Sequence, residues 1–192
     1  MWKTCSFQTN GWLDYIDNYV LKNINVINGD IRDESFIYHN TKNIDTIFNL
    51  AALIGIPYSY RSTESYIDTN IKGTFNLLSA SKNQKVKKII HISTSEVYGS
   101  AQQIPISEKH PVVGQSPYSA SKISAEQLCI AYNRSFALPV TILRPFNVFG
   151  PRQSTRAIIP TIIGQYMQNR KFINLGLMTP TRDFNYVEDT IE

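Results

Sequence analysis

The sequence predicts an α/β protein built on a doubly wound parallel sheet. Short runs rich in β-branched residues alternate along the chain with longer helical stretches, and this alternation is typical of parallel strands joined by helices. The expected strands are also almost continuously apolar, as strands buried on both faces are. We therefore expect one sheet with helices on both faces.

The expected elements follow one another in the order strand, strand, helix, strand, helix, strand, helix. The strands are the apolar runs at residues 24–28, 45–50, 88–93 and 139–144. The helices are expected near residues 63–80, 117–135 and 155–169. Six prolines stand at or near the connections between these segments: Pro57, Pro111, Pro117, Pro145, Pro151 and Pro160.

Composition excludes several classes of protein. With 42% hydrophobic and 18% charged residues, the chain has the make-up of an ordinary globular protein. Cys5 and Cys129 are far apart in sequence, which favours free thiols over a disulfide. No apolar run approaches the ~18 residues of a membrane span, and no signal-peptide core stands at the start. We expect a cytoplasmic protein that does not bind membranes.

The formal net charge of +4 does not indicate nucleic-acid binding. The basic residues are dispersed, apart from one cluster before the strand at 88–93, and no aromatic residues are interleaved with them. The three histidines, His39, His91 and His110, lack metal-ligand spacing. We expect neither nucleic acid nor metal to bind.

Tyr118 and Lys122 stand four residues apart. In a helix they lie on one face, a turn apart, although this spacing alone also arises by chance. A free tyrosine titrates near ~10. An ammonium ~5 Å away at an effective dielectric of ~20 contributes about 3 kcal/mol, or roughly two pKa units. The spacing predicts that Tyr118 acts as a base near neutral pH.

A second signal is the segment from Ser93 to Gly99, which follows the buried strand at 88–93. Thr94, Ser95 and Glu96 are expected at the carboxyl edge of the sheet, where open α/β folds bind their ligands. A glutamate in this position can also be an exposed loop residue. Together with the Tyr118/Lys122 pair, we interpret it as part of a site.

These two segments, followed by the run from Leu143 to Gln153, resemble the extended short-chain dehydrogenase/reductase family and specifically its nucleotide-sugar 4,6-dehydratases. The resemblance covers nearly the whole chain. In detail, the chain most resembles dehydratases of N-acetylglucosamine nucleotides. It includes the segments at residues 29–33, 49–52, 70–76 and 182–187. It implies a Rossmann-type sheet, bound NAD, a nucleotide-sugar substrate and a homodimer. A mildly positive chain suits such an anionic ligand.

The resemblance also implies catalytic roles. Tyr118, assisted by Lys122, takes the proton of the sugar C4 hydroxyl, which Thr94 holds by a hydrogen bond. Glu96 removes the C5 proton. Many relatives have an aspartate where this chain has Ser95, and serine is too weak an acid to protonate a leaving hydroxide. Glu96, or a water that it holds, must then return the proton.

Binding roles come from the same resemblance. Asp30 accepts a hydrogen bond from the adenine amino group, Ile31 packs on the adenine ring, and the carbonyl of Pro145 lies near the nicotinamide amide. Asn147 and Arg182 suit the diphosphate of the substrate. The expected cofactor residues are Asp30, Ile31, Leu50, Ala51, Ala52, Tyr118, Lys122 and Pro145.

The expected organisation is a partial dinucleotide-binding domain at residues 1–150 and the start of a substrate-binding lobe at residues 151–192. None of the nine glycines forms a G-x-G-x-x-G series, the phosphate-binding turn expected in such a fold. We therefore expect an internal fragment that lacks the first βαβ unit and most of the C-terminal lobe.

Three alternatives remain open at this stage. A 4-epimerase would use the same Tyr118/Lys122 pair, but it needs no base at C5, and neither does a simple dehydrogenase or reductase. The chain could also be an inactive, truncated product. Glu96 favours the dehydratase.

Overall fold

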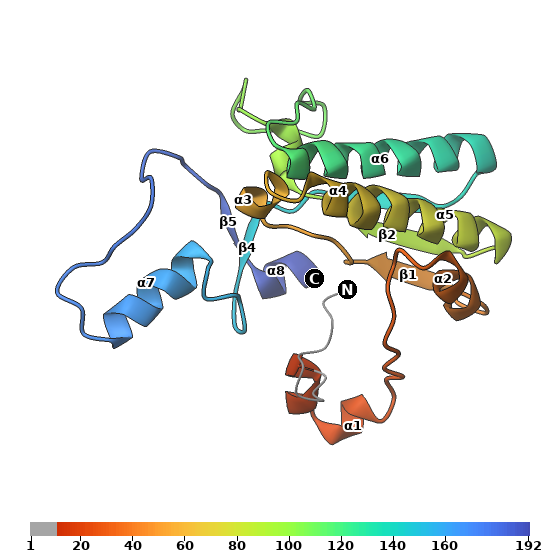
Figure 1. The fold of residues 1–192 in the computed structure, drawn as a ribbon, viewed down its shortest axis with the longest axis horizontal. Coiled ribbons are helices and arrows are strands. Elements are labelled where there is room, and N and C mark those ends of the chain that lie inside the picture. Colours follow the sequence, from red (N-terminus) through yellow and green to blue (C-terminus); the bar gives the residue numbers. More distant parts are fainter. Residues whose placement is uncertain (1–10) are drawn as a thin grey trace. The chain divides into compact units, whose positions relative to one another are not determined.

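A three-stranded parallel sheet forms the centre of the larger of two units. The computed structural model describes residues 11–192, and these divide into one unit that ends at Arg144 and a second that spans Pro145–Glu192. The sheet order is β1-β2-β3, and Figure 1 labels the neighbouring strands β1 and β2. Its strands are β1 Thr46–Asn49, β2 Lys88–Ile92 and β3 Val140–Leu143.

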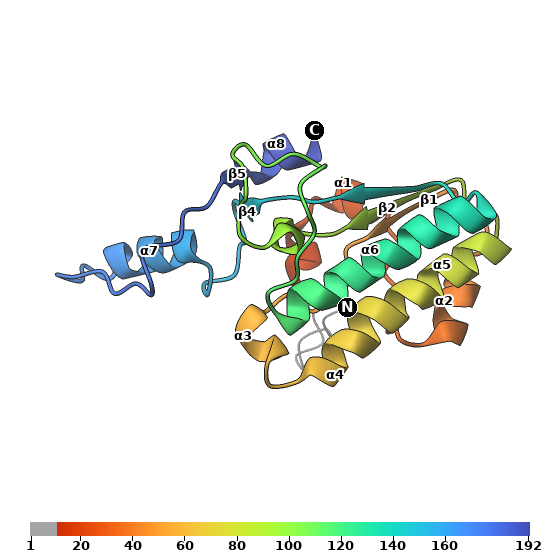
Figure 2. The same cartoon turned by 90° about the horizontal axis from the view of Figure 1, so that it is seen from above.

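The register brings alternate side chains onto common faces. Ile47 pairs with Ile89, which pairs in turn with Val140. This face packs on α5 (Gly73–Asn83) and α6 (Pro117–Phe136), as Figure 2 shows. The buried core residues between sheet and helices are Leu78, Val86, Ile89, Cys129 and Leu138.

The helices of this unit connect the strands and place the site residues. Three of them, α4, η2 and α5, follow one another without a break, and η2 is a π-helix. Their bounds are η1 Gly11–Tyr15, α1 Asn18–Leu21, α2 Glu34–Asn40, α3 Ile56–Ser59, α4 Thr63–Tyr66, η2 Ile67–Lys72, α5 Gly73–Asn83, η3 Ser95–Tyr98 and α6 Pro117–Phe136.

The start of α6 is fixed by a capping box. The Ser116 hydroxyl accepts a hydrogen bond from the Ser119 amide at 3.0 Å, and the Ser119 hydroxyl accepts one from the Ser116 amide at 2.9 Å. Pro117 occupies the first turn, where its missing N–H costs nothing. Tyr118 therefore lies in a first turn whose geometry is well defined.

The π-helical turn is held by Asn70, whose side chain is fully buried. Its Oδ1 accepts a hydrogen bond from the Leu53 amide at 2.8 Å, and its Nδ2 donates to the Leu53 carbonyl at 3.0 Å and to Ser121 Oγ at 2.9 Å. One amide side chain thus joins the loop after β1 to α6. Single π-helical turns are frequent at functional sites.

The predicted parallel sheet and helices are confirmed, with one exception among the strands. Residues 24–28 are extended but form no strand, and Ile24, Val26 and Ile27 are exposed. A strand needs a neighbour for its backbone hydrogen bonds, and none of the described strands lies beside these residues.

Cover on both sheet faces, also predicted, is not seen in the described part of the chain. On the face opposite α5 and α6, Phe48 and Leu143 are 62% and 41% exposed. Ile90 and Ile92 of β2 share this face and are half-buried. Its apolar pattern is that of a buried strand face, although no described helix packs on it.

The second unit contains a separate two-stranded parallel sheet. Asn147 pairs with Phe184, and Phe149 pairs with Tyr186. Gly150 is required here, because a Cβ at this position would lie 2.5 Å from Val187 Cγ1. The elements are β4 Asn147–Phe149, α7 Ile158–Met167, β5 Phe184–Tyr186 and α8 Val187–Ile191. The division into a cofactor domain at 1–150 and a substrate lobe at 151–192 stays a prediction.

Candidate active site

Tyr118 and Lys122 are both buried on α6, one helical turn apart, near the N-terminal end of the helix. The Tyr118 ring makes an edge-to-face contact with Tyr66, with centroids 6.2 Å apart. The Lys122 Nζ donates a 2.6 Å hydrogen bond to the carbonyl of Ile92, the last residue of β2. The lysine is therefore fixed against the carboxyl end of the central strand.

Burial lowers the pKa of Lys122 to about 8, although the negative charge of Glu126 and the Cys129 thiol act in the opposite direction. An ammonium is costly to desolvate, so burial favours the neutral amine. At pH 7 most of the lysine is still charged. Above pH 8 most of it is neutral.

The prediction of an acidic tyrosine is wrong for this structure. Burial raises the pKa of Tyr118, and the charge of Glu96 raises it further, while the Thr94 side chain acts in the opposite direction. Two physical causes explain the difference from the prediction. The phenol is desolvated, and the ammonium of Lys122 is directed at the Ile92 carbonyl. Tyr118 is a neutral phenol at pH 7.

Thr94, Ser95 and Glu96 lie where the sequence predicts, at the carboxyl end of β2. Thr94 caps the short helix η3, its Oγ1 accepting a hydrogen bond from the Glu96 amide at 3.2 Å. All three residues are half-buried. The turn η3 packs against α6, and Thr94 and Glu96 both influence the pKa of Tyr118.

Gly99 ends this turn in a conformation that suits glycine. Its φ is 65°, and a Cβ would lie 2.6 Å from the Val113 carbonyl oxygen. The Val113 amide donates to the Val97 carbonyl at 2.8 Å. The segment that carries Glu96 is therefore held against the chain that leads into α6.

His91, a buried histidine, precedes Ile92 in β2, the residue whose carbonyl accepts the Lys122 hydrogen bond. Asn49 Nδ2 donates to His91 Nδ1 at 3.1 Å, so the proton of the neutral ring is on Nε2. Nε2 has no hydrogen-bond partner within the part of the chain that the structure describes. Burial, with a contribution from the charge of Lys122, lowers the pKa of His91 to about 3. His91 is neutral at every physiological pH.

Arg144 is satisfied inside the fold. It forms a two-bond ion pair with the fully buried carboxylate of Glu126, with Nε–Oε1 at 2.9 Å and Nη2–Oε2 at 2.6 Å. Its Nη1 also donates to the Tyr98 hydroxyl at 3.2 Å. Glu126 is not among the residues predicted from the sequence. Glu126 stands four residues after Lys122, and this spacing puts both on the same buried helix face.

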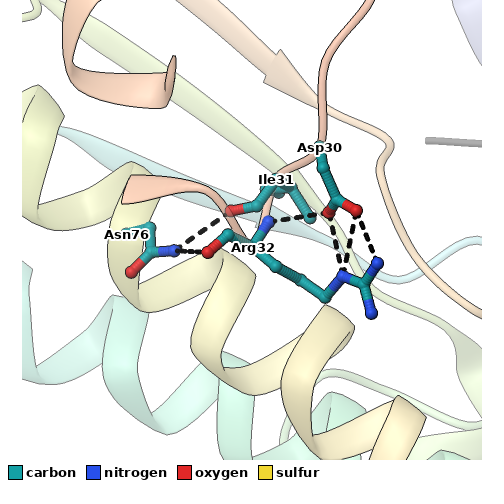
Figure 3. A network of polar contacts seen from close by, with 4 residues as sticks. All are labelled: Asp30, Ile31, Arg32 and Asn76. Atoms are coloured by element: carbon teal, nitrogen blue, oxygen red, sulfur yellow. Dashed lines mark hydrogen bonds and ion pairs between the residues drawn. The ribbon is translucent and has the colours of Figure 1, made fainter. Parts of the chain in front are cut away.

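The predicted adenine segment is a rigid turn, drawn in Figure 3. Arg32 forms an ion pair with Asp30 at 2.6 Å and lowers the Asp30 pKa to about 2. Asn76 Nδ2 donates to the carbonyls of Ile31 and Arg32 at 3.1 and 3.0 Å. The Asp30 side chain is 47% exposed, so an ionised, acceptor-only group is open to solvent beside Ile31.

An open apolar pocket of about 350 Å³ lies beside this turn. Three predicted cofactor residues, Ile31, Leu50 and Ala51, line it. Ala52, another predicted cofactor residue, follows Ala51 in the same loop and is half-buried. The other lining residues are Phe36, Ile37 and Phe48.

Nearly the whole chain matches the sequence model of a known protein family. The sequence model of the family described as GDP-mannose 4,6 dehydratase matches residues 3–192. The chain belongs to this family.

Members of the GDP-mannose 4,6-dehydratase family and related proteins resemble the chain in sequence and structure. The chain is 35% identical over 199 residues to a dTDP-D-glucose 4,6-dehydratase of Dictyostelium discoideum. This match covers 93% of the chain and 46% of that protein. The chain thus spans about half the length of the curated relatives it matches.

Two solved structures show the same fold and confirm the Rossmann-type architecture. A UDP-N-acetylglucosamine 4-epimerase of Methanobrevibacter ruminantium M1 superposes with a TM-score of 0.86 at 33% identity, over 95% of this chain and 60% of that one. The dTDP-glucose 4,6-dehydratase DesIV of Streptomyces venezuelae, solved with NAD, gives a TM-score of 0.79 at 28% identity, over 91% and 56%. The similarity thus includes both dehydratases and epimerases.

The remaining predicted residues of this family member lie in the second unit. Pro145 begins this unit. Asn147 is in β4, where its backbone N–H donates to the Asp183 carbonyl at 3.1 Å. Arg182 is exposed, and its Nη1 donates to the Thr181 carbonyl at 2.8 Å. Their roles toward cofactor and substrate stay predictions.

No group of three or more His, Cys, Asp and Glu side chains among residues 11–192 could hold a metal ion. No helix in that range is long and apolar enough to cross a membrane.

Proposed function

We propose that the whole protein is an NAD-dependent dehydratase that converts a nucleotide-activated hexose to its 4-keto-6-deoxy form. The observation that carries this proposal is the packing of η3, which bears Glu96, against α6, which bears the Tyr-x-x-x-Lys pair. The Glu96 charge also acts on the pKa of Tyr118. An oxidising site alone has no use for this second base. Family membership and the dehydratases among the relatives support the same reaction.

The residues present suit NAD. The apolar pocket at Ile31, Leu50 and Ala51 offers a surface for a flat aromatic ring, and the Asp30 carboxylate beside it accepts hydrogen bonds. Ala52, Tyr118, Lys122 and Pro145 complete the proposed set. When bound, NAD supplies the hydride acceptor for C4 of the sugar and returns the hydride to C6.

The chain's own groups handle the protons. Thr94 holds the C4 hydroxyl. Tyr118 receives its proton as a phenolate, a form that the ligand-bound site has to favour, with the Lys122 charge in support. The resulting C4 ketone makes the C5 hydrogen acidic, and Glu96 removes it while the C6 hydroxyl departs. Ser95 cannot protonate the leaving group, so the proton that makes water comes from Glu96 or from a water that Glu96 holds. C5 takes up one proton as the hydride returns to C6, and release of the proton that Tyr118 accepted balances this uptake.

Asn147 and Arg182 are proposed to bind the substrate diphosphate, since amide and guanidinium donors suit phosphate oxygens. The formal net charge of +4 is compatible with an anionic substrate. We place the whole protein in the cytoplasm as a homodimer.

A 4-epimerase is the second candidate, favoured by the structural match to a UDP-N-acetylglucosamine 4-epimerase. Both reactions begin with oxidation at C4 by the same tyrosine and lysine. They differ at C5, where only dehydration needs a base.

The deciding experiment incubates the whole protein with dTDP-glucose, UDP-glucose, GDP-mannose and UDP-N-acetylglucosamine in separate reactions with NAD. Mass spectrometry of the nucleotide sugar then separates the two candidates. Dehydration gives a product lighter by one water, whereas epimerisation leaves the mass unchanged. Products of unchanged mass but altered chromatographic mobility would refute the dehydratase.

A further inference from the structure

We propose that the buried Glu126–Arg144 pair, together with Tyr98, is a positioning unit that holds the Lys122 turn of α6 and the Glu96 turn η3 in one arrangement. The inference rests on the proposed function. It concerns residues that touch neither the proposed substrate nor the proposed cofactor.

The first half of the unit connects Arg144 to α6. Glu126 is completely buried and lies one turn beyond Lys122 on the same helix face. Both of its carboxylate oxygens accept hydrogen bonds from Arg144, at 2.9 and 2.6 Å. A planar, two-bond contact of this kind fixes orientation as well as distance.

The second half connects Arg144 to η3. Its Nη1 donates to the Tyr98 hydroxyl at 3.2 Å, and its guanidinium carbon lies 5.0 Å from the Tyr98 ring centroid. Tyr98 is buried, stands two residues after Glu96, and packs edge-on against His110 with centroids 5.6 Å apart. One guanidinium therefore contacts both α6 and η3.

This connection matters because the two proposed bases lie on different segments. Tyr118 and Lys122 are on α6, and Glu96 is on η3. A catalytic arrangement has to be held within about 0.5 Å to be productive. The Arg144 side chain, at the end of β3, supplies a rigid link between them.

The unit also acts on the charge of the lysine. The Glu126 carboxylate faces Lys122 from the same helix, and its negative charge stabilises the ammonium against burial. The other titratable groups that interact with Lys122 are Cys129 on α6 and His91 on β2, which is neutral. Loss of the Glu126 charge therefore lowers the pKa of the lysine.

The first test needs neither cofactor nor substrate. The 192-residue chain is labelled with ¹³C-lysine, and the Lys122 resonance is followed by NMR from pH 6 to 11 in the parent and in Glu126→Gln. We expect Lys122 to titrate at lower pH in the variant. The control Glu64→Gln, which changes an exposed glutamate on α4, should titrate as the parent does.

Glu126→Gln leaves Arg144 partly buried without its counter-ion, which can prevent folding. The double variant Glu126→Gln/Arg144→Met removes both charges and keeps the test decisive. It should also lower the pKa of Lys122. An unchanged Lys122 titration in whichever variant folds would overturn the proposal.

The second test uses Tyr98→Phe in the whole protein, which removes only the hydroxyl that Arg144 contacts. In a single turnover, the nicotinamide absorbance should appear at the parental rate, while formation of the 4-keto-6-deoxy product slows about tenfold, the equivalent of roughly one hydrogen bond. Tyr132→Phe, a half-buried tyrosine elsewhere on α6, should leave both rates unchanged. Equal effects of Tyr98→Phe on the two steps, or no effect, would contradict the positioning role.

The two tests also separate this inference from the function on which it rests. A shifted Lys122 titration in a protein that makes no dehydrated product would refute the dehydratase and leave the Glu126–Lys122 coupling standing.

Discussion

The protonation of Tyr118 is set by burial and by charged groups on neighbouring segments. Its phenol is neutral at pH 7 because burial and the Glu96 charge raise its pKa. Lys122, with a pKa of about 8, is still mostly charged at that pH. For Tyr118 to accept a proton, the site must gain positive charge or lose negative charge when its ligands bind.

The role of Glu96 is tested by Glu96→Gln in the whole protein. Glutamine keeps the size and hydrogen bonds but cannot take a proton, while Tyr118 and Lys122 remain able to oxidise C4. We expect reduced nicotinamide to accumulate in a single turnover without dehydrated product. Tyr118→Phe should instead abolish the reduced-nicotinamide signal. Product formation by Glu96→Gln at the parental rate would show that another group is the C5 base.

The buried lysine predicts a pH dependence of stability. The folded pKa of Lys122, about 8, lies below the ordinary lysine value of 10.5. The unfolded chain therefore binds more protons between these two values, and folding becomes more favourable as the pH rises through this window. The penalty for burying the charge is fully present below pH 8. It amounts to about 3 kcal/mol for a shift of this size.

Urea unfolding of the chain and of Lys122→Met measures this effect. Methionine has a similar length and no charge, so the variant lacks the penalty. The stability of the variant relative to the parent should fall by up to about 3 kcal/mol between pH 7.5 and 10.5. Ile92 loses its hydrogen-bond donor at every pH, so this loss cancels in the difference. Parallel pH profiles would show that Lys122 is not desolvated.

At the scale of elements, the helix that carries the site depends on an amide in the π-helical turn. Asn70→Ala removes three hydrogen bonds and leaves the Leu53 amide and carbonyl without their partner. We expect a loss of about 2–4 kcal/mol in the free energy of unfolding. Chemical denaturation measures it, with the exposed Asn83→Ala at the end of α5 as the matched control. Equal losses in both variants would show that the Asn70 contacts contribute little.

The elements also show how far sequence patterns reach. Strands β1, β2 and β3 and helix α6 are predictable, because apolar periodicity and capping residues act locally. The segment at 24–28 has the same composition, but strand formation also requires a partner, and composition carries no information about the neighbour. The π-helical turn depends on a contact between Asn70 and Leu53, 17 positions apart, and leaves no local signature.

The site was predictable to the extent that its chemistry is local. Thr94, Ser95 and Glu96 follow a recognisable buried strand, and the turn that carries them packs against α6. The direction of the Tyr118 pKa shift was not predictable, because it depends on where the Lys122 ammonium points and on how much water the fold excludes. Both are properties of tertiary packing.

For the whole molecule, the absence of a G-x-G-x-x-G series from the 192 residues predicts weak cofactor binding. A glycine-rich turn at a helix N-terminus normally supplies the charge-assisted bonds to the pyrophosphate, each contributing about 1.5–3 kcal/mol. Calorimetric titration of the chain with NAD should therefore show affinity orders of magnitude below that of the whole protein. Micromolar binding by the 192-residue chain would refute this prediction.

The Nε2–H of His91, which has no hydrogen-bond partner among residues 11–192, provides an intrinsic spectroscopic probe of the buried lysine. The imidazole stays neutral above pH 3 or so, so its resonances do not report its own titration near neutrality. The Lys122 charge nevertheless acts on this ring, and its loss near pH 8 changes the electric field there. A proton sealed from solvent also exchanges slowly enough to be observed. The shift of this one histidine signal with pH therefore follows the protonation of a neighbour that is harder to detect directly.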